Sequence, residues 1–465
     1  MINILIPVNK NVTPIYKYYP IFLIKLSKFL KKVGINVTIL QFSDMLADQF
    51  DNPIVINNDE VECDNKSISE LEKEYNFSLR QILYTDLMQT SKFVIDSRYR
   101  NFFIPDEYFT NEKLYENKLN QLLKILESKK YSYVITDQTT DFEHIFLRHY
   151  CRKNNIPFIR YLPNFMNRGY FTHYESDGNI KIMELAINNY EKKTIIDFIE
   201  NYKSNDDHSI YEMYNDYSIY QSKKSIIEKL KDKNLNDYKN YINWNLRDFY
   251  YNKIENILKK PFYSKFDNTV KYIFYGLGLA TESHVALHSY PFINQVNLIE
   301  SISRSLPFGY ILYTKPHPWF SSTIGLKDIK RISKIPSVKI LDPKQSIRPI
   351  LNEAKGVITL NGTVGIEALT IGCPVIALGE INSYTDFHPN AYLCNNPYDL
   401  SEMIVRMVNE RAKSEDTISY FMRMFNHSID IPFEADRYLS EEDANDKAKK
   451  FSKYIELVIS NFNNN

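Results

Sequence analysis

The sequence contains few of the residues that stabilise small secreted proteins or cross a membrane. Its four cysteines are scattered over 465 residues, with no CxxC pair and no cysteine–histidine spacing typical of zinc. This argues against a disulfide framework and a structural zinc site, and favours a reducing compartment. No apolar run approaches the roughly 18–20 residues of a membrane span. The first ten residues lack signal-peptide features, so we expect a cytoplasmic protein, with peripheral contact at the inner face of the membrane left open.

An excess of either charge is also missing. Lys and Arg together number 57, and so do Asp and Glu, so the formal net charge is zero and gives no reason to propose a nucleic-acid partner. Glycine is sparse, whereas Tyr and Phe accompany many Ile, Asn and Lys residues. We attribute this composition to an AT-rich genome and do not interpret the aromatic residues as stacking platforms. The chain is too long for one compact core, which predicts two to three domains.

Strands and helices are predicted to alternate in two parts of the chain, which indicates an α/β fold with parallel sheets. The first part contains predicted strands at Ile2–Val8, Asn36–Leu40, Tyr133–Thr136 and Ile156–Tyr161, and helices at Ile21–Lys32, Leu114–Ser128 and Phe142–Lys153. The second contains predicted strands at Tyr272–Tyr275, Gly309–Thr314 and Val338–Leu341, and helices at Phe292–Ser305 and Gln345–Ala354. We therefore expect two doubly wound lobes, at 1–180 and 263–410. A helical insertion or linker at 181–262 and C-terminal helices at 411–465 that pack back on the first lobe complete the predicted division.

The most informative stretch is Glu353–Glu380, which has the pattern of a βαβ unit. It consists of a predicted strand, turn, helix and second strand, at Gly356–Leu360, Asn361–Thr363, Val364–Ile371 and Pro374–Leu378. Gly362 gives the turn conformational freedom, and Thr363 is suited to capping the helix. The turn therefore offers backbone N–H groups to a phosphate or carboxylate. An ordinary βαβ crossover with a capped helix explains the same pattern and stays open as the alternative.

A second polar segment, Lys315–Pro318, follows the predicted strand Gly309–Thr314. Ligands gather at this end of strands in open α/β sheets. The two prolines restrict the backbone on either side of His317. Lys supplies charge and His a hydrogen bond or a proton, which suits a phosphate leaving group. The alternative is a proline-rich connection with a surface Lys and a His bonded to the backbone.

Other carboxylates complete the candidate site. Glu282 lies in the predicted loop Gly276–Tyr290, after a third strand of the same lobe. Glu367 lies one turn inside the helix after the polar turn, where it can accept both hydroxyls of a ribose or simply favour the helix dipole. Asp137 and Asp141 follow the strand Tyr133–Thr136, and we expect one of them to deprotonate a sugar hydroxyl. Helix capping is the alternative for both aspartates, and Glu282 is the competing candidate base.

The order and spacing of these motifs over Lys271–Pro389 resemble those of the bacterial capsular polysaccharide biosynthesis proteins, a group related to Kdo transferases. The matching segments are Glu282, Asn294-Gln295, Lys315–Pro318, Thr363–Leu369 and Gly372–Val375. The His-Pro motif and the hydroxyl-bearing turn also resemble those of bacterial sialyltransferases. The chain departs from the family pattern at Thr281, Pro316 and Gly362, where Pro, an acidic residue and Ser are frequent. These departures bear on the identity of the donor sugar more than on the fold.

The resemblance implies a GT-B glycosyltransferase, with two Rossmann-like lobes facing a cleft. The C-terminal lobe would hold a nucleotide-sugar donor, with a glycan or glycolipid as the acceptor. Lys315 and His317 would stabilise the leaving phosphate, Glu367 would hold the ribose, and the turn would donate hydrogen bonds through Asn361, Gly362, Thr363, Val364 and Gly365. No metal and no resident cofactor is needed in this scheme.

The expected function is therefore transfer of a sugar to a surface or capsular polysaccharide. A CMP-activated acidic sugar, such as Kdo or a sialic-acid-like sugar, is the expected donor. A CDP-alcohol-dependent polyol-phosphate transferase and a non-catalytic scaffold of a glycan assembly complex are the alternatives.

Overall fold

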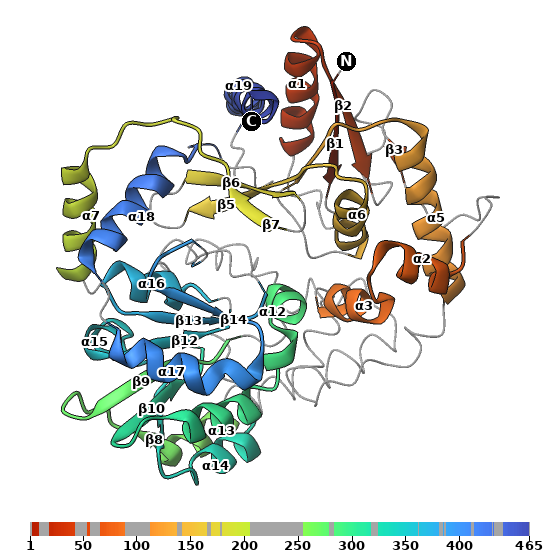
Figure 1. Cartoon of the computed structure of the whole chain (residues 1–465). Helices are drawn as coiled ribbons and strands as arrows, with labels where there is room; N and C mark the ends of the chain where they lie inside the picture. Colours follow the sequence, from red (N-terminus) through yellow and green to blue (C-terminus); the bar gives the residue numbers. More distant parts are fainter. Residues whose placement is uncertain are drawn as a thin grey trace, which may run out of the picture. The chain divides into compact units, whose positions relative to one another are not determined.

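The computed structural model describes most of the chain, and the statements below concern only these residues: 2–8, 18–41, 54–55, 66–88, 112–136, 142–164, 169–176, 179–204, 254–278, 283–317, 324–360, 362–380, 385, 387–410, 413–429, 431 and 440–464. The chain divides into two compact units (Figure 1). Unit 1 comprises Met1–Gln89, Ile104–Glu191 and Phe421–Asn465, and unit 2 comprises Thr90–Phe103 and Lys192–Tyr420.

Unit 1 is built on a sheet in the order β3-β2-β1-β4-β5-β6-β7. Its strands are β1 Ile2–Val8, β2 Ile35–Gln41, β3 Ile54–Val55, β4 Tyr133–Thr136, β5 Phe158–Asn164, β6 Gly169–Ser176 and β7 Asn179–Ile182. The first five strands pair in parallel, while β6 and β7 extend the sheet in antiparallel fashion. The order 3-2-1-4-5 is that of a doubly wound fold.

The C-terminal helix of the chain completes the core of unit 1. The helices of this unit are α1 Tyr19–Lys32, α2 Ile68–Tyr75, α3 Leu79–Met88, α5 Glu112–Ser128, α6 Phe142–Lys153 and α19 Glu441–Asn464. Figure 1 shows α19 beside α1, and the rings of Phe22 and Phe451 lie 5.9 Å apart between centroids. The hydroxyls of Thr172 on β6 and Tyr454 on α19 are 2.6 Å apart. The last helix therefore packs on both the first helix and the sheet of unit 1.

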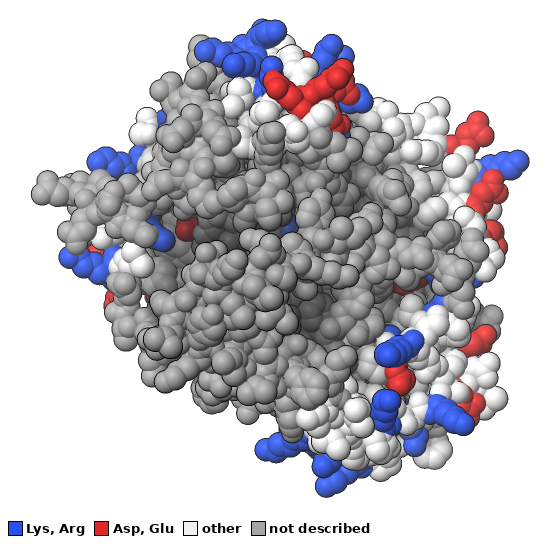
Figure 2. Space-filling view, turned by 180° about the vertical axis from the view of Figure 1, so that it is seen from behind, with Lys and Arg blue, Asp and Glu red and all other residues white. Residues whose placement is uncertain are grey.

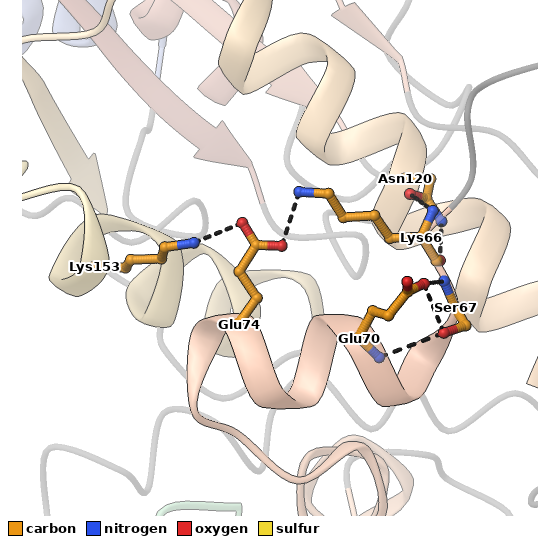
Figure 3. A network of polar contacts seen from close by, with 6 residues as sticks. All are labelled: Lys66, Ser67, Glu70, Glu74, Asn120 and Lys153. Carbon is orange, nitrogen blue, oxygen red and sulfur yellow. Dashed lines mark hydrogen bonds and ion pairs between the residues drawn. The ribbon is translucent and has the colours of Figure 1, made fainter.

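A surface network joins α2 to α5 and α6 (Figure 3). Ser67 and Glu70 form a capping box at the start of α2. Glu74 accepts hydrogen bonds from the ammonium groups of Lys66, at 2.8 Å, and Lys153, at 2.6 Å. These two hydrogen bonds lower the pKa of Glu74. Because exposed ion pairs contribute at most about 1 kcal/mol each, this network orients the helices more than it stabilises them.

Unit 2 contains a fully parallel sheet in the order β14-β13-β12-β9-β10-β11-β8. Its strands are β8 Tyr263–Ser264, β9 Lys271–Gly276, β10 Tyr310–Lys315, β11 Val338–Leu341, β12 Val357–Thr359, β13 Val375–Leu378 and β14 Ala391–Cys394. From β11 to β14, the strands follow the Rossmann order 3-2-1-4-5-6. The chain therefore reverses its winding direction between β9 and β12, which makes that place the topological switch point of this sheet.

Helices precede, connect and follow these strands. They are α7 Lys192–Ser204, α11 Asn256–Lys259, α12 Ser283–His288, α13 Gln295–Ser305, α14 Leu326–Ile332, α15 Arg348–Glu353, α16 Val364–Thr370 and α17 Leu400–Asn409. Helix α18, Ser414–Asn426, contains the boundary between the two units. Every residue of β12 and β13 is buried, as expected for parallel strands covered on both faces.

The predicted α/β class with two doubly wound lobes is confirmed, but one local prediction is wrong and several strands were not predicted. The stretch Gly276–Tyr290, expected to be a loop, contains helix α12, which is too short for its periodicity to be detected. Strand β14 was not predicted, and only its Cys394 is buried. Strands β6 and β7 were not predicted. Residues 205–253 of the predicted helical insertion lie outside the described part of the chain.

The described surface has no dominant sign of charge on the face drawn in Figure 2. Lys and Arg side chains lie interspersed with Asp and Glu side chains there, as the zero net charge predicts. Among the described helices, none combines the length and the apolar content that a membrane crossing requires.

Candidate functional site

The predicted site residues of unit 2 leave the sheet at one edge. Strand β9 lies between β10 and β12, and all three run in parallel. Lys315 pairs with Gly276 across β10 and β9, while Ile358 pairs with Tyr275 across β12 and β9. The segments that follow β10 and β12 thus start on either side of β9, and their strands are separated by roughly 10 Å, twice the spacing of neighbouring strands. This is the carboxyl edge at the switch point, where open α/β sheets bind ligands.

The exit of β9 packs closely against the turn before α16. A Cβ atom placed on Gly276 would lie 3.5 Å from Cγ1 of Val364, and one on Gly278 would lie 3.7 Å from Cβ of Leu360. At Gly365 a Cβ atom would lie 2.8 Å from Cγ2 of Thr385, so this position in the first turn of α16 has no room for a side chain. The first two distances are ordinary van der Waals contacts, so only Gly365 is required by the close packing of α16.

The turn itself is closed differently from the expectation. The N–H of Gly362 donates to Oγ1 of Thr359, at 3.1 Å. Thr363 occupies the N-cap position of α16, yet among the described residues of that helix no backbone N–H is capped by its hydroxyl. The prediction that Thr363 caps the helix is therefore wrong. Thr359 organises the turn, which leaves the Thr363 hydroxyl uncommitted to the helix backbone.

Lys315 and His317 differ in charge state. Lys315 is 8% exposed and its Nζ donates to the carbonyl of Pro343, at 3.0 Å. Burial lowers its pKa to about 8, against the attraction of Glu367 and Asp342, so the ammonium group stays mostly charged at pH 7. Burial, followed by the charge of Lys315, lowers the pKa of His317 to about 4. At neutral pH the site therefore combines a cation with a neutral imidazole, whose N–H can donate a hydrogen bond.

Glu367 lies inside the protein, on α16. It is 1% exposed, and its Oε2 accepts a hydrogen bond from the Tyr202 hydroxyl, at 3.2 Å. The guanidinium carbon of Arg348 lies 3.5 Å from the centroid of the Tyr202 ring. Burial raises the pKa of Glu367 to about 7, while Arg348, the hydroxyl of Tyr202 and Lys315 oppose the rise. The sequence singled out Glu367 but neither Tyr202 nor Arg348, because no local motif connects residues so distant in the chain.

The structure describes His317 and most of the predicted donor-binding residues, but none of the three carboxylates predicted to act as the base. Lys315, His317, Glu367 and the turn from Gly362 to Gly365 lie in unit 2, on β10, α16 and the segments next to them. Asn361, Glu282, Asp137 and Asp141 lie outside the described residues, so the roles assigned to them remain predictions.

The Asn-Gln pair of the motif has a clear structural role. The side chain of Asn294 caps α13 by accepting from the N–H of Asn297, at 3.2 Å. The amide of Gln295 donates to the carbonyl of Gly278, at 2.8 Å, and its oxygen accepts from the N–H of the same glycine, at 2.9 Å. The hydroxyl of Tyr275 lies 3.0 Å from the same oxygen. Gln295 thus fixes the backbone at the exit of β9, four residues before Glu282.

Replacement of Gln295 by Glu should impair activity more than stability. The variant keeps the shape but places a carboxylate oxygen against the carbonyl of Gly278, so the loop before Glu282 is expected to shift. A displacement of about 1 Å at a reacting group can cost 10²-fold, so we expect kcat/KM to fall about 10- to 100-fold. Steady-state kinetics together with thermal unfolding would measure both effects. The matched control is Asn297→Asp, which adds the same charge to an exposed position of the same helix. Equal activity in the two variants would contradict the role of Gln295.

Residues 208–385 match the family model described as capsule polysaccharide biosynthesis protein. This part of the chain is similar to the capsule polysaccharide biosynthesis proteins. The resemblance predicted from the motifs is thereby confirmed, although the matched segment begins earlier than Lys271 and ends shortly before Pro389.

Several solved structures align with the chain at low identity. A glycosyltransferase from Rickettsia africae aligns at 12% identity over 98% of this chain and 98% of its own, with a TM-score of 0.31. Anabaena HepE, in complex with UDP, aligns at 11% identity over 99% of this chain and 97% of its own, with a TM-score of 0.30. KpsC from Thermosulfurimonas dismutans, a beta Kdo 2,7 transferase, aligns at 12% identity over 72% of this chain and 98% of its own, with a TM-score of 0.30.

At such scores these alignments carry no conclusion about activity or ligand. No curated protein matches the sequence. The likeness to capsule polysaccharide biosynthesis proteins therefore rests on the family-model match, whereas the strand orders alone define the two lobes.

Proposed function

We propose that the chain is a metal-independent GT-B glycosyltransferase that transfers a CMP-activated acidic sugar to a surface or capsular polysaccharide. The observation that carries the proposal is the position of Lys315, His317 and the turn at Gly362–Thr363. Lys315 ends β10, His317 follows it, and the turn follows β12; these two strands flank β9 at the switch point of unit 2. A nucleotide phosphate placed at this edge would meet a cation, a neutral imidazole and a hydroxyl.

Each of these groups has a distinct part in the proposed reaction. The bond between the anomeric carbon and the phosphate oxygen breaks, and a bond from that carbon to an acceptor hydroxyl forms. Negative charge builds up on the leaving phosphate, where Lys315 supplies the opposite charge and His317 donates a hydrogen bond. Thr363 donates its hydroxyl to the same phosphate, and Glu367 accepts from the ribose. The proton of the acceptor hydroxyl passes to Asp137, Asp141 or Glu282.

A nucleotide panel read by thermal unfolding tests this proposal. The protein is heated with CMP, CDP, UDP or GDP, each with and without EDTA, because each nucleotide points to a different class of donor. A ligand at 100 times its Kd raises the free energy of unfolding by about 2.7 kcal/mol. We expect CMP to give the largest rise and EDTA to leave it unchanged.

The other outcomes separate the alternatives. A larger rise with CDP, followed by turnover of a CDP-alcohol, would replace the proposal by a polyol-phosphate transferase. A larger rise with UDP or GDP would contradict the CMP-linked donor. No rise with any nucleotide would favour a non-catalytic scaffold. A rise that EDTA abolishes would overturn the metal-independent scheme.

A further inference from the structure

Three helices of unit 2 enclose one buried carboxylate. Glu367 on α16, Tyr202 on α7 and Arg348 on α15 are 1%, 6% and 4% exposed. Charged groups are costly to bury unless they are paired and hydrogen-bonded, so a cluster of this kind requires an explanation. Glu367 lies one turn beyond Thr363, on the helix that begins at the polar turn. The cluster therefore lies next to the candidate site but is not among the residues that we expect to face the phosphate.

The geometry gives Tyr202 two contacts at once. Its hydroxyl donates to Oε2 of Glu367, at 3.2 Å, and its ring lies under the guanidinium group of Arg348, at 3.5 Å. A stacked guanidinium at this distance is attracted by the ring. Tyr202 thus fixes the carboxylate and the guanidinium relative to each other, from a helix that precedes the strands of the unit in sequence.

We propose that Tyr202, supported by Arg348, is a positioning residue that keeps Glu367 oriented and ionised so that it can accept the ribose hydroxyls of the nucleotide. This inference rests on the proposed function. Only an ionised carboxylate is a pure acceptor with capacity for both hydroxyls, because a protonated one carries a donor of its own. Tyr202 engages Oε2, so it holds the side chain in one rotamer while the ribose is bound.

The proposal predicts a definite dependence on pH. Burial raises the pKa of Glu367 to about 7, and the groups that oppose this rise are Arg348 from α15, Tyr202 from α7 and Lys315 from β10. Removal of the Tyr202 hydroxyl removes one of them, so the pKa of Glu367 should rise further. A smaller fraction of Glu367 is then ionised at pH 7, and nucleotide binding should recover as the pH is raised.

The test compares Tyr202→Phe with the wild-type protein. This variant keeps the ring under Arg348 and loses only the hydroxyl. We expect the Kd for CMP and the donor KM at pH 7 to rise about tenfold, in line with the loss of a hydrogen bond to a charged group, while kcat changes less than about twofold. The ratio of variant to wild-type Kd should fall between pH 6 and pH 9. Since Lys315 titrates in both proteins, its effect cancels in this ratio.

Two further variants serve as references. Glu367→Gln should bind CMP weakly. Because this variant has no carboxyl group at position 367, its Kd should not show the pH dependence that Tyr202→Phe is expected to shift. Tyr313→Phe removes another buried tyrosine hydroxyl of unit 2, one that accepts from the N–H of Asp267, at 3.0 Å. It should leave CMP binding unchanged.

The outcomes distinguish this inference from the function on which it rests. If the wild-type protein does not bind CMP, the proposed function fails. If Glu367→Gln weakens binding while Tyr202→Phe retains the wild-type Kd and pH profile, only the role of Tyr202 is overturned. Tighter binding by Tyr202→Phe would also overturn it, because Tyr202 would then compete with the ribose for Glu367.

Discussion

Replacement of His317 by Ala is expected to lower kcat/KM for sugar transfer by about 10²- to 10³-fold, the loss found when one preorganised donor to a developing anion is removed. The reason lies in the environment of the side chain. Burial and the charge of Lys315 hold the pKa of His317 at about 4, so at pH 7 its imidazole is a neutral donor at the end of β10. Lys315, whose Nζ bonds the carbonyl of Pro343, supplies the charge but cannot replace that donor. Initial rates with a CMP-linked donor would measure the loss, and thermal unfolding would confirm the fold.

The matched variant is His317→Gln, which keeps an N–H donor and should retain more activity than His317→Ala. The sign of the pH effect also follows from the pKa. Because the native pKa lies below the ordinary value of about 6.5, the unfolded chain binds the proton more readily between these two values. The His317 contribution to stability is therefore lost as the pH falls from about 6.5 towards 4, and His317→Gln should lack this loss. Equal transfer rates in the wild-type, Ala and Gln proteins would remove His317 from the reaction.

Much of the fold could be predicted because the signals are local. The strands Ile2–Val8, Tyr133–Thr136 and Val338–Leu341 and the helix Phe142–Lys153 have the bounds that the sequence predicts. Each strand is a short, mostly apolar run. The helix begins after a polar segment that interrupts the apolar residues. Alternation of such elements predicts parallel sheets, because a parallel connection requires a crossover.

The missed elements lack such signals. Strands β6 and β7 form an antiparallel extension after β5, which the alternation of strands and helices does not predict. Strand β14 ends the described sheet of unit 2; its apolar run, Ala391–Cys394, has only four residues and buries one of them, so it is too short to stand out as a strand. Pairing with a neighbouring strand, rather than the residues themselves, determines these segments.

The same distinction applies to the candidate site. Lys315, His317 and the turn at Gly362–Thr363 were predicted because each follows an apolar strand within a few residues. Tyr202 and Glu367 are 165 residues apart in sequence, so their hydrogen bond has no sequence pattern. It was equally impossible to predict from the sequence whether the hydroxyl of Thr359 or that of Thr363 would bond to the backbone of the turn. Both residues lie close to the turn, and only the backbone conformation decides between them.

Replacement of Glu175 by Leu is expected to destabilise unit 1 by about 3–5 kcal/mol, because it leaves a buried guanidinium group without its counter-charge. Glu175 on β6 accepts a hydrogen bond from Nε of Arg148, at 2.6 Å, and pairs with Arg152 from the same helix, α6. Burial raises the pKa of Glu175, but the two arginines more than offset it, so its pKa lies below the ordinary value. Its contribution to stability is therefore present above the unfolded pKa of about 4.3 and is lost as the pH falls through the lower native value. Denaturant unfolding between pH 3 and pH 7 would measure both effects.

Two controls separate the buried charge from a general effect of substitution. Glu74→Gln breaks both exposed ion pairs of the network in Figure 3, in the same unit, and should cost no more than about 2 kcal/mol. The double variant Arg148→Met with Glu175→Leu removes both buried charges, and it should recover most of the stability because a buried ion pair is often replaced by apolar residues without loss. Arg152, whose side chain is 42% exposed, can then turn towards solvent. If the double variant were as unstable as Glu175→Leu, the loss would come from packing between β6 and α6 rather than from the unpaired charge of Arg148.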